Sequence, residues 1–322
     1  MDCDLSPPGE KFATDLKMVM EIDQVEVLKI SGFNNRLKGL LMTLVGAFCF
    51  SLVPIWVRSI EAYSFISIVF YRALIGFFFL FIWVLRQPKM RSKVVLSRLG
   101  WKYRLVLCAV GFCMCGTAST YYLAIMKTSV AKAVLLHYTA PIYVAIMSPF
   151  ILKEHNAPLT WFAVAAGLLG TALIVGPSCL LQASQDELIG VVSALLSGIF
   201  LAGVFLFGRF LAGYLSSQIR TLWSCLIVVI LILPWGIQIP DGHFWHNLPL
   251  LCLLGTVSLA LPYTLFFQAQ NYISAQTSSM VALFEPVCGI GIGFLFFGEK
   301  LTLLGSIGGA IVLFSIYIAS RR

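Results

Sequence analysis

Two stretches decide the fold: SVAKAVLLHYTAPIYVAIMSPFILKE at residues 129–154 and SAQTSSMVALFEPVCGIGIGFLFFGE at residues 274–299. Aligned without gaps, they place Pro141 on Pro286 and Glu154 on Glu299, with the same offset of 145 residues for both pairs. Each stretch is apolar, has a proline near its middle and an acid at its end, and is followed by another apolar segment. Internal repetition of a hydrophobic unit is typical of membrane transporters.

The composition indicates an integral membrane protein. Hydrophobic residues make up 59% of the 322 residues and charged residues 11%, and the mean hydropathy is +0.92. A helix that crosses a bilayer needs about 20 largely apolar residues. The sequence therefore predicts an all-α protein with ten transmembrane helices. The predicted spans are 38–57, 64–85, 105–125, 129–151, 159–176, 188–208, 216–236, 249–270, 276–297 and 301–320.

The ten predicted spans divide into two repeats of five. Because five is an odd number, the second repeat enters the membrane from the opposite side, so we expect two inverted five-helix repeats at residues 38–176 and 188–320. Residues 1–37 hold seven of the fourteen acids and no long apolar segment, which excludes a signal peptide. We expect them to form an acidic cytoplasmic N-terminal tail.

The basic residues predict the orientation in the membrane. Segment 86–104 holds seven Lys and Arg and no acid. If the N-terminus is cytoplasmic, fifteen Lys and Arg near the spans lie on the cytoplasmic side and four on the outer side, as the positive-inside rule requires. We therefore expect both termini in the cytoplasm. The formal net charge of +8 is explained by topology, and we expect no nucleic-acid partner.

The sequence predicts neither a metal site nor a cofactor. Seven of the nine cysteines lie within predicted spans, where a thiol behaves as a small apolar side chain. Cys113 and Cys115 are two residues apart, so they face different sides of a helix. The GxxxxGK[ST] motif that ATP-driven pumps need does not occur in the sequence.

Three ionisable side chains lie deep in the predicted spans: Glu285, Arg72 and His137. A charge at the centre of a membrane helix costs about 2.5–3.5 kcal/mol of insertion free energy, so we expect each of these residues to have a functional or structural role. Glu285 could bind a solute or a proton, or it could form a buried ion pair with Arg72 that only fixes the helices. His137 could contact a solute, or it could be hydrogen-bonded between helices.

Pro141 and Pro286 predict helix kinks near mid-membrane. Proline has no N–H, so a carbonyl one turn earlier loses its partner. Irregular backbone at this depth is tolerated only where it faces protein or a water-filled cavity. His137 lies four residues before Pro141, and Glu285 immediately precedes Pro286. Both repeats therefore place a kink beside an ionisable group, and we predict a polar cavity there.

Aromatic and amide side chains are further candidates for the wall of this cavity, since they can stack on a solute or form cation–π and hydrogen-bond contacts. Taken singly, each could instead serve packing or anchor a helix at the membrane interface. The predicted substrate-binding or cavity residues are Glu285, His137, Tyr138, Arg72, Tyr121, Gln268, Tyr263 and Trp56.

Small residues spaced four apart predict close helix packing. Such pairs are Gly289 with Gly293 and Gly305 with Gly309. They leave the oligomeric state open, and both a monomer and a homodimer are compatible with the sequence.

Taken together, these features resemble the EamA-type carriers of the drug/metabolite transporter superfamily. The resemblance covers about residues 37–320 and rests on LHYTAP at 136–141 followed by LKE at 152–154, and on LFEP at 283–286 followed by FGEK at 297–300. It implies a basket-like bundle with a central substrate cavity and with spans 5 and 10 at the periphery. It also implies transport of small metabolites across a prokaryotic inner membrane. Glu154 and Glu299 match the loop acids of the family, which we interpret as helix-end or gating elements.

We therefore predict a secondary-active transporter, not an enzyme. Its substrates would be small polar or amphipathic metabolites, amino-acid-like or drug-like, moved by alternating access between the two halves. Export is favoured over import by analogy alone, and proton coupling through Glu285 is a further hypothesis. Two alternatives are a non-transporting scaffold or receptor, which needs no polar cavity, and a lipid-headgroup flippase, which needs a lateral opening between spans.

Overall fold

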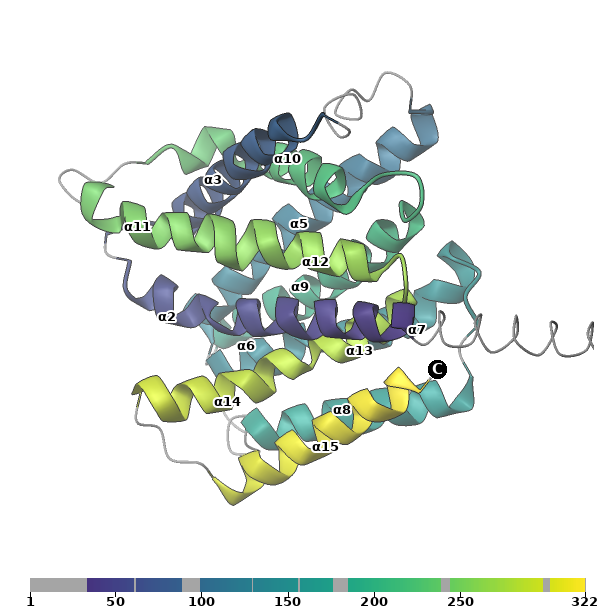
Figure 1. Ribbon diagram of the computed structural model, residues 1–322. Helices are drawn as coiled ribbons and strands as arrows, with labels where there is room; N and C mark the ends of the chain where they lie inside the picture. Colours follow the sequence, from purple (N-terminus) through teal and green to yellow (C-terminus); the bar gives the residue numbers. More distant parts are fainter. Residues whose placement is uncertain are drawn as a thin grey trace, which may run out of the picture.

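The structure is a computed structural model that describes residues 34–60, 62–88, 99–128, 130–155, 157–175, 185–238, 244–297 and 302–321. The predicted acidic tail lies almost entirely outside these ranges. The described residues form helices and no strand (Figure 1). After a helix over residues 34–51, the elements are α2 (Val53–Arg58), α3 (Phe65–Arg86), α5 (Trp101–Lys127), α6 (Val130–His137), α7 (Ala140–Ile151), α8 (Pro158–Val175), α9 (Gln185–Phe210), α10 (Ser217–Gly236), α11 (Phe244–Gly255), the π-helix η3 (Thr256–Ala260), α12 (Leu261–Ala269), α13 (Ala275–Ala282), α14 (Phe284–Phe297) and α15 (Leu303–Ser320).

Nine helical segments within the described residues are long and apolar enough to cross a membrane, and each corresponds to one predicted span. The other predicted span, 276–297, consists of two shorter helices, α13 and α14, which are separated at Leu283. The reason is Pro286, which cannot donate a hydrogen bond to a preceding turn and therefore lies in the first turn of a new helix.

The equivalent segment in the first half is also divided. α6 ends at His137, and Tyr138 and Thr139 form a turn before α7 begins with Pro141 in its first turn. The N–H of Thr139 donates to the carbonyl of Leu136 at 3.2 Å, a tighter pattern than that of an α-helix. Both halves of the chain therefore carry a helix break a few residues before the proline.

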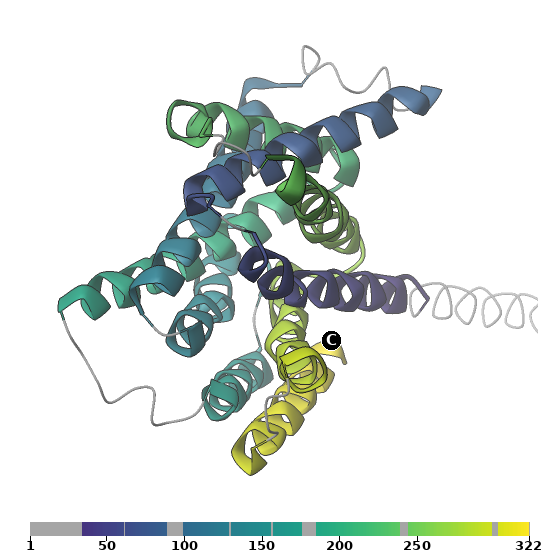
Figure 2. The same cartoon turned by 90° about the vertical axis from the view of Figure 1, so that its left-hand side faces the viewer.

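α8 and α15 lie side by side along one edge of the bundle (Figures 1 and 2). Their backbones approach closely at Gly170 and Gly308, because a Cβ added to Gly308 would lie 2.5 Å from the carbonyl oxygen of Gly170. The close packing predicted at Gly289 is wrong: a Cβ there would meet no other described atom within 4 Å.

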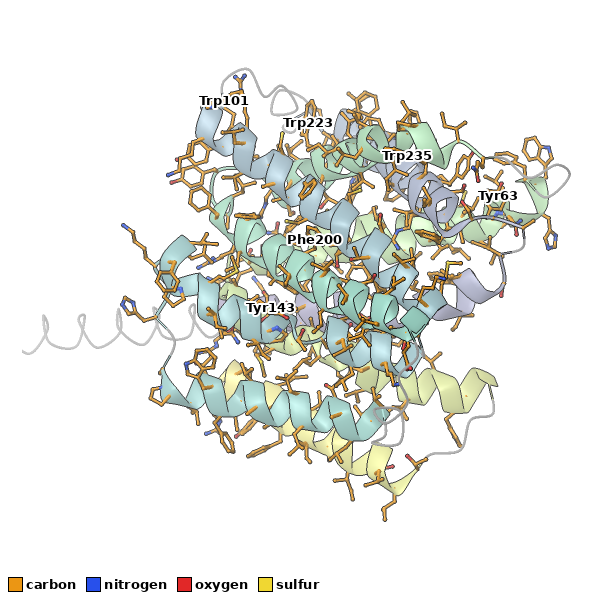
Figure 3. The ribbon with its side chains drawn as sticks, turned by 180° about the vertical axis from the view of Figure 1, so that it is seen from behind. Tyr63, Trp101, Tyr143, Phe200, Trp223 and Trp235 are labelled. Atoms are coloured by element: carbon orange, nitrogen blue, oxygen red, sulfur yellow. The ribbon has the colours of Figure 1, made fainter. Side chains whose placement is uncertain are left out.

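The main buried core lies between α3, α5, α9, α10 and α12. At its edge the partly buried Phe200 of α9, labelled in Figure 3, packs against Gly116 of α5, where an added Cβ would lie 2.7 Å from the ring. Outer helix faces expose large apolar side chains such as Phe112 and Phe162, as expected of a surface that contacts lipid. Trp101 and Trp235, at ends of α5 and α10, are exposed and suit the membrane interface (Figure 3).

Candidate substrate-binding cavity

A cavity of about 220 Å³ lies inside the bundle, and both halves of the chain contribute to its wall. The first half contributes from the helix over residues 34–51, α2, α3, α5 and α6, and the second half from α9, α12, α13 and α14. Most of the wall is apolar, with a few polar and charged groups, which is the usual character of a small-molecule site.

Six of the eight predicted site residues line this cavity. They are Glu285, His137, Tyr138, Arg72, Tyr121 and Tyr263. The sequence places them in five separate predicted spans, and the fold brings them together.

Gln268 and Trp56 do not line the cavity. Along α12 and the residue after it, Tyr263, Phe266, Phe267 and Gln270 face the cavity at helical spacing. Gln268 lies off this face, and its Oε1 accepts a hydrogen bond from Ser217 Oγ at 2.8 Å. In α2 the cavity is lined by Val53 and Val57, and Trp56 is not among the lining residues.

Glu285 is the second residue of α14, immediately after the break. The side chain of Tyr138, in the turn between α6 and α7, lies close enough to the carboxyl group of Glu285 to interact with it. The two helix breaks therefore lie next to each other in the wall of the cavity. This arrangement places an acid at the meeting point of the two halves.

Arg72 lies in α3, and its side chain is 6% exposed. Its Nη1 donates a hydrogen bond to the Tyr122 hydroxyl at 2.7 Å, and its Cζ lies 5.9 Å from the centre of the Tyr122 ring. Its Nε has no hydrogen-bond partner among the described residues. A buried guanidinium with an unused donor has capacity to bind an anionic group.

Arg72 and Glu285 line the same cavity, yet no ion pair joins them in the described part of the chain. The structure thus lacks the buried ion pair that was the alternative interpretation of these residues. An unpaired charge in a low-dielectric site is costly, so each of these groups favours a partner of opposite charge from outside the protein.

His137 is hydrogen-bonded between helices and also lines the cavity. Its Nδ1 lies 2.8 Å from Ser197 Oγ of α9, and its ring lies 4.4 Å from the ring of Tyr121 while lining the cavity. The carbonyl of His137 faces α9 closely, because a Cβ added to Gly198 would lie 2.9 Å from it. In this half, the carbonyl that Pro141 frees is therefore covered by a neighbouring helix.

The two prolines and the two loop acids occupy different surroundings. Pro286 lines the cavity, whereas Pro141 is not among the lining residues. Glu154 follows α7 and forms an ion pair with Arg209, with 2.8 Å between Oε1 and Nε. Glu299 lies outside the described residues.

The set of predicted residues omitted four polar residues of the cavity wall: Ser51, Thr117, Tyr122 and Gln270. Gln270 could have been found from helical spacing, since it lies seven residues after Tyr263. Tyr122 carries no comparable signal, because the adjacent Tyr121 is an equally good candidate. Within the described residues, no group of three or more His, Cys, Asp or Glu could hold a metal ion.

The sequence matches the EamA-like transporter family over residues 37–176 and 188–321, and the chain belongs to this family. An uncharacterized transporter of Archaeoglobus fulgidus is 29% identical over 271 residues, which are 84% of this chain and 92% of the relative. The threonine/homoserine exporter RhtA of Escherichia coli is 27% identical over 222 residues, or 68% of this chain and 72% of the exporter.

A solved crystal structure of another protein has the same fold. Its TM-score with this chain is 0.72 at 14% identity, and the match covers 87% of this chain and 96% of the other. Together with the family match and the long apolar helices, these findings define a multi-pass membrane transporter.

Proposed function

We propose that this protein is a secondary-active transporter of zwitterionic, amino-acid-like metabolites. The observation that carries the proposal is the pair of opposite charges, Arg72 and Glu285, which line one cavity without neutralising each other. A solute with both a carboxylate and an ammonium group would supply the missing partner for each.

The chemistry of the wall suits such a solute. The guanidinium of Arg72 would bind the carboxylate, for which its planar donors are well matched. Glu285, beside Tyr138 in the cavity wall, would bind the ammonium group. Phe50, Phe266 and Phe267 would surround the apolar remainder. The name of the relative RhtA, a threonine/homoserine exporter, supports this class of substrate and favours export.

The proposed architecture is ten transmembrane helices in two inverted five-helix repeats, at residues 38–176 and 188–320, with α13 and α14 together forming the ninth span. The two helix breaks, one in each half and both before a proline, support this symmetry. Both termini would be cytoplasmic and the membrane would be the cell inner membrane. Alternating access would follow from rocking of the two halves about the cavity.

A thermal-shift series tests the substrate class. Purified protein is heated with L-threonine, with its methyl ester, which lacks the carboxylate, and with its N-acetyl derivative, which lacks the ammonium group. A ligand at one hundred times its Kd stabilises a protein by about 2.7 kcal/mol. We expect a shift for the free amino acid and a much smaller one for both derivatives.

Two variants test which residue binds the carboxylate of the solute and which binds its ammonium group. We expect Arg72→Gln to abolish the distinction between the amino acid and its methyl ester, and Glu285→Gln to abolish the distinction from the N-acetyl derivative. Arg72→Lys retains the positive charge and serves as the control, so it should still distinguish the amino acid from its methyl ester. Equal shifts for all three compounds in the wild type would contradict the proposal.

A further inference from the structure

One end of the bundle holds a charged cluster outside the cavity, which we call the latch. It consists of Glu154, Arg209, the carbonyl of Gln270 and the N–H of Ala275. Arg209 Nε donates to Glu154 Oε1 at 2.8 Å, and its Nη1 donates to the carbonyl oxygen of Gln270. The N–H of Ala275 donates to Glu154 Oε2 at 3.3 Å. The latch therefore ties together the turn after α7 and the ends of α9, α12 and α13.

The backbone around Glu154 is adapted to this contact. Lys153, directly after α7 and its C-cap, has a φ of 58°, a left-handed conformation in which glycine is usual. Such strain in a residue other than glycine persists only where the surroundings enforce it, and it is common at functional elements. At the other side, the first N–H groups of α13 have no partner within their own helix. The Glu154 carboxylate satisfies one of them and suits the positive end of the helix dipole.

The latch lies directly behind the wall of the cavity. Gln270 lines the cavity, and its carbonyl oxygen accepts the hydrogen bond from Arg209. Phe205 and Phe266, whose ring centres are 5.7 Å apart, also belong to the wall. Movement of the end of α12 would therefore alter the cavity and the latch together.

We propose that the Glu154–Arg209 ion pair closes this end of the cavity and breaks once in each transport cycle. The proposal rests on the proposed alternating-access function. Glu154 belongs to the first half of the chain, whereas Arg209, Gln270 and Ala275 belong to the second, so relative rocking of the halves must separate them.

The exposure of the pair suits repeated opening. The side chains of Arg209 and Glu154 are 29% and 22% exposed, so water reaches both ions when they part. A fully buried pair would leave desolvated charges and would make opening far more costly. A part-exposed pair contributes modestly, which allows the closed and open states to remain close in free energy.

The test measures access to the cavity from each side of the membrane. Ala118, a partly exposed residue of the cavity wall, is changed to cysteine in the full chain after replacement of the native cysteines. A membrane-impermeant maleimide is applied to inside-out and to right-side-out vesicles. We expect Glu154→Gln to raise the labelling rate from the latch side about fivefold, the scale of a part-exposed ion pair, with no increase from the other side.

A double-mutant cycle and a matched control make the test specific. Because Glu154 and Arg209 act as one pair, the double variant Glu154→Gln/Arg209→Gln should label no faster than either single variant. Arg209→Gln breaks the same ion pair and provides a second route if Glu154→Gln fails to fold, whereas Arg209→Lys keeps the charge and should label at close to the wild-type rate. Glu187→Gln breaks the ion pair between Glu187, near the start of α9, and Lys132, near the start of α6. This pair lies at the end of α9 opposite to Arg209, so the variant should not raise labelling from the latch side.

Unchanged labelling in Glu154→Gln, or an equal increase in the Glu187→Gln control, would overturn the latch. The amino-acid-induced thermal shift separates this outcome from failure of the proposed function. If only the latch is mistaken, the wild type and Glu154→Gln both keep the shift. If the substrate class is mistaken, the wild type shows none.

Discussion

At the scale of single residues, two buried arginines show how a charge inside a membrane protein is satisfied. Arg220 is fully buried, and it donates to the carbonyl oxygens of Gly208 and Phe267 at 2.6 Å each, near the ends of α9 and α12. Cations are stabilised at helix C-termini, where carbonyls lack partners. Arg72 instead has one side-chain partner and faces the cavity. Arg220 is therefore structural, and Arg72 has capacity for a ligand.

Replacing Arg220 should destabilise the protein without altering substrate preference. In Arg220→Met two buried carbonyls lose charged donors, and we expect a loss of about 2–4 kcal/mol in the free energy of unfolding. Replacing the exposed Arg86 by Met should change the free energy of unfolding by no more than about 0.5 kcal/mol. Denaturation of both purified variants in detergent measures the difference, and equal stabilities would refute the structural role of Arg220.

The candidate site was partly predictable because charges at membrane depth are rare. Glu285, Arg72 and His137 were identified from depth alone, and all three line the cavity. The ion pair of Glu154 with Arg209 was not predictable, since both residues lie near predicted span ends where charges are common. Which of them meet depends on the arrangement of helices that are distant in sequence.

At the scale of helices, proline positions predicted where the backbone would be irregular, and breaks occur a few residues before Pro141 and Pro286. Glycine positions were a poorer guide to which helices pack closely together. Spacing of small residues indicates a helix that can pack closely, but it does not identify the partner or the face. The close contact involves Gly308 and Gly170, between the two helices at the edge of the bundle.

Gly308→Ala should therefore separate α8 from α15. The added Cβ would lie 2.5 Å from the carbonyl oxygen of Gly170, and relief of this overlap should cost about 1–3 kcal/mol. Gly291→Ala, where no other described atom lies within 4 Å of the new Cβ, should be neutral or stabilising by up to about 1 kcal/mol. Thermal denaturation of the two variants compares them directly. A Gly308→Ala variant as stable as Gly291→Ala would show that the helices do not pack at this point.

At the scale of the whole molecule, hydrophobicity predicted most of the membrane spans because the lipid bilayer fixes their length. It could not predict that the span at 276–297 would be two helices, nor which helices would enclose the cavity. That arrangement comes from packing between the two halves of the chain. Both halves enclose the cavity, and we propose that its opposite charges bind and move a zwitterion.

Uptake into proteoliposomes tests that claim most directly. The labelled amino acid that gives the largest thermal shift is offered to vesicles containing the wild type or Glu285→Gln, with and without a pH gradient. We expect saturable uptake by the wild type that increases with the gradient, and uptake by Glu285→Gln that is strongly reduced and independent of it. Equal, gradient-dependent uptake in both would remove Glu285 from coupling, and wild-type uptake no greater than in empty vesicles would contradict the proposed transport.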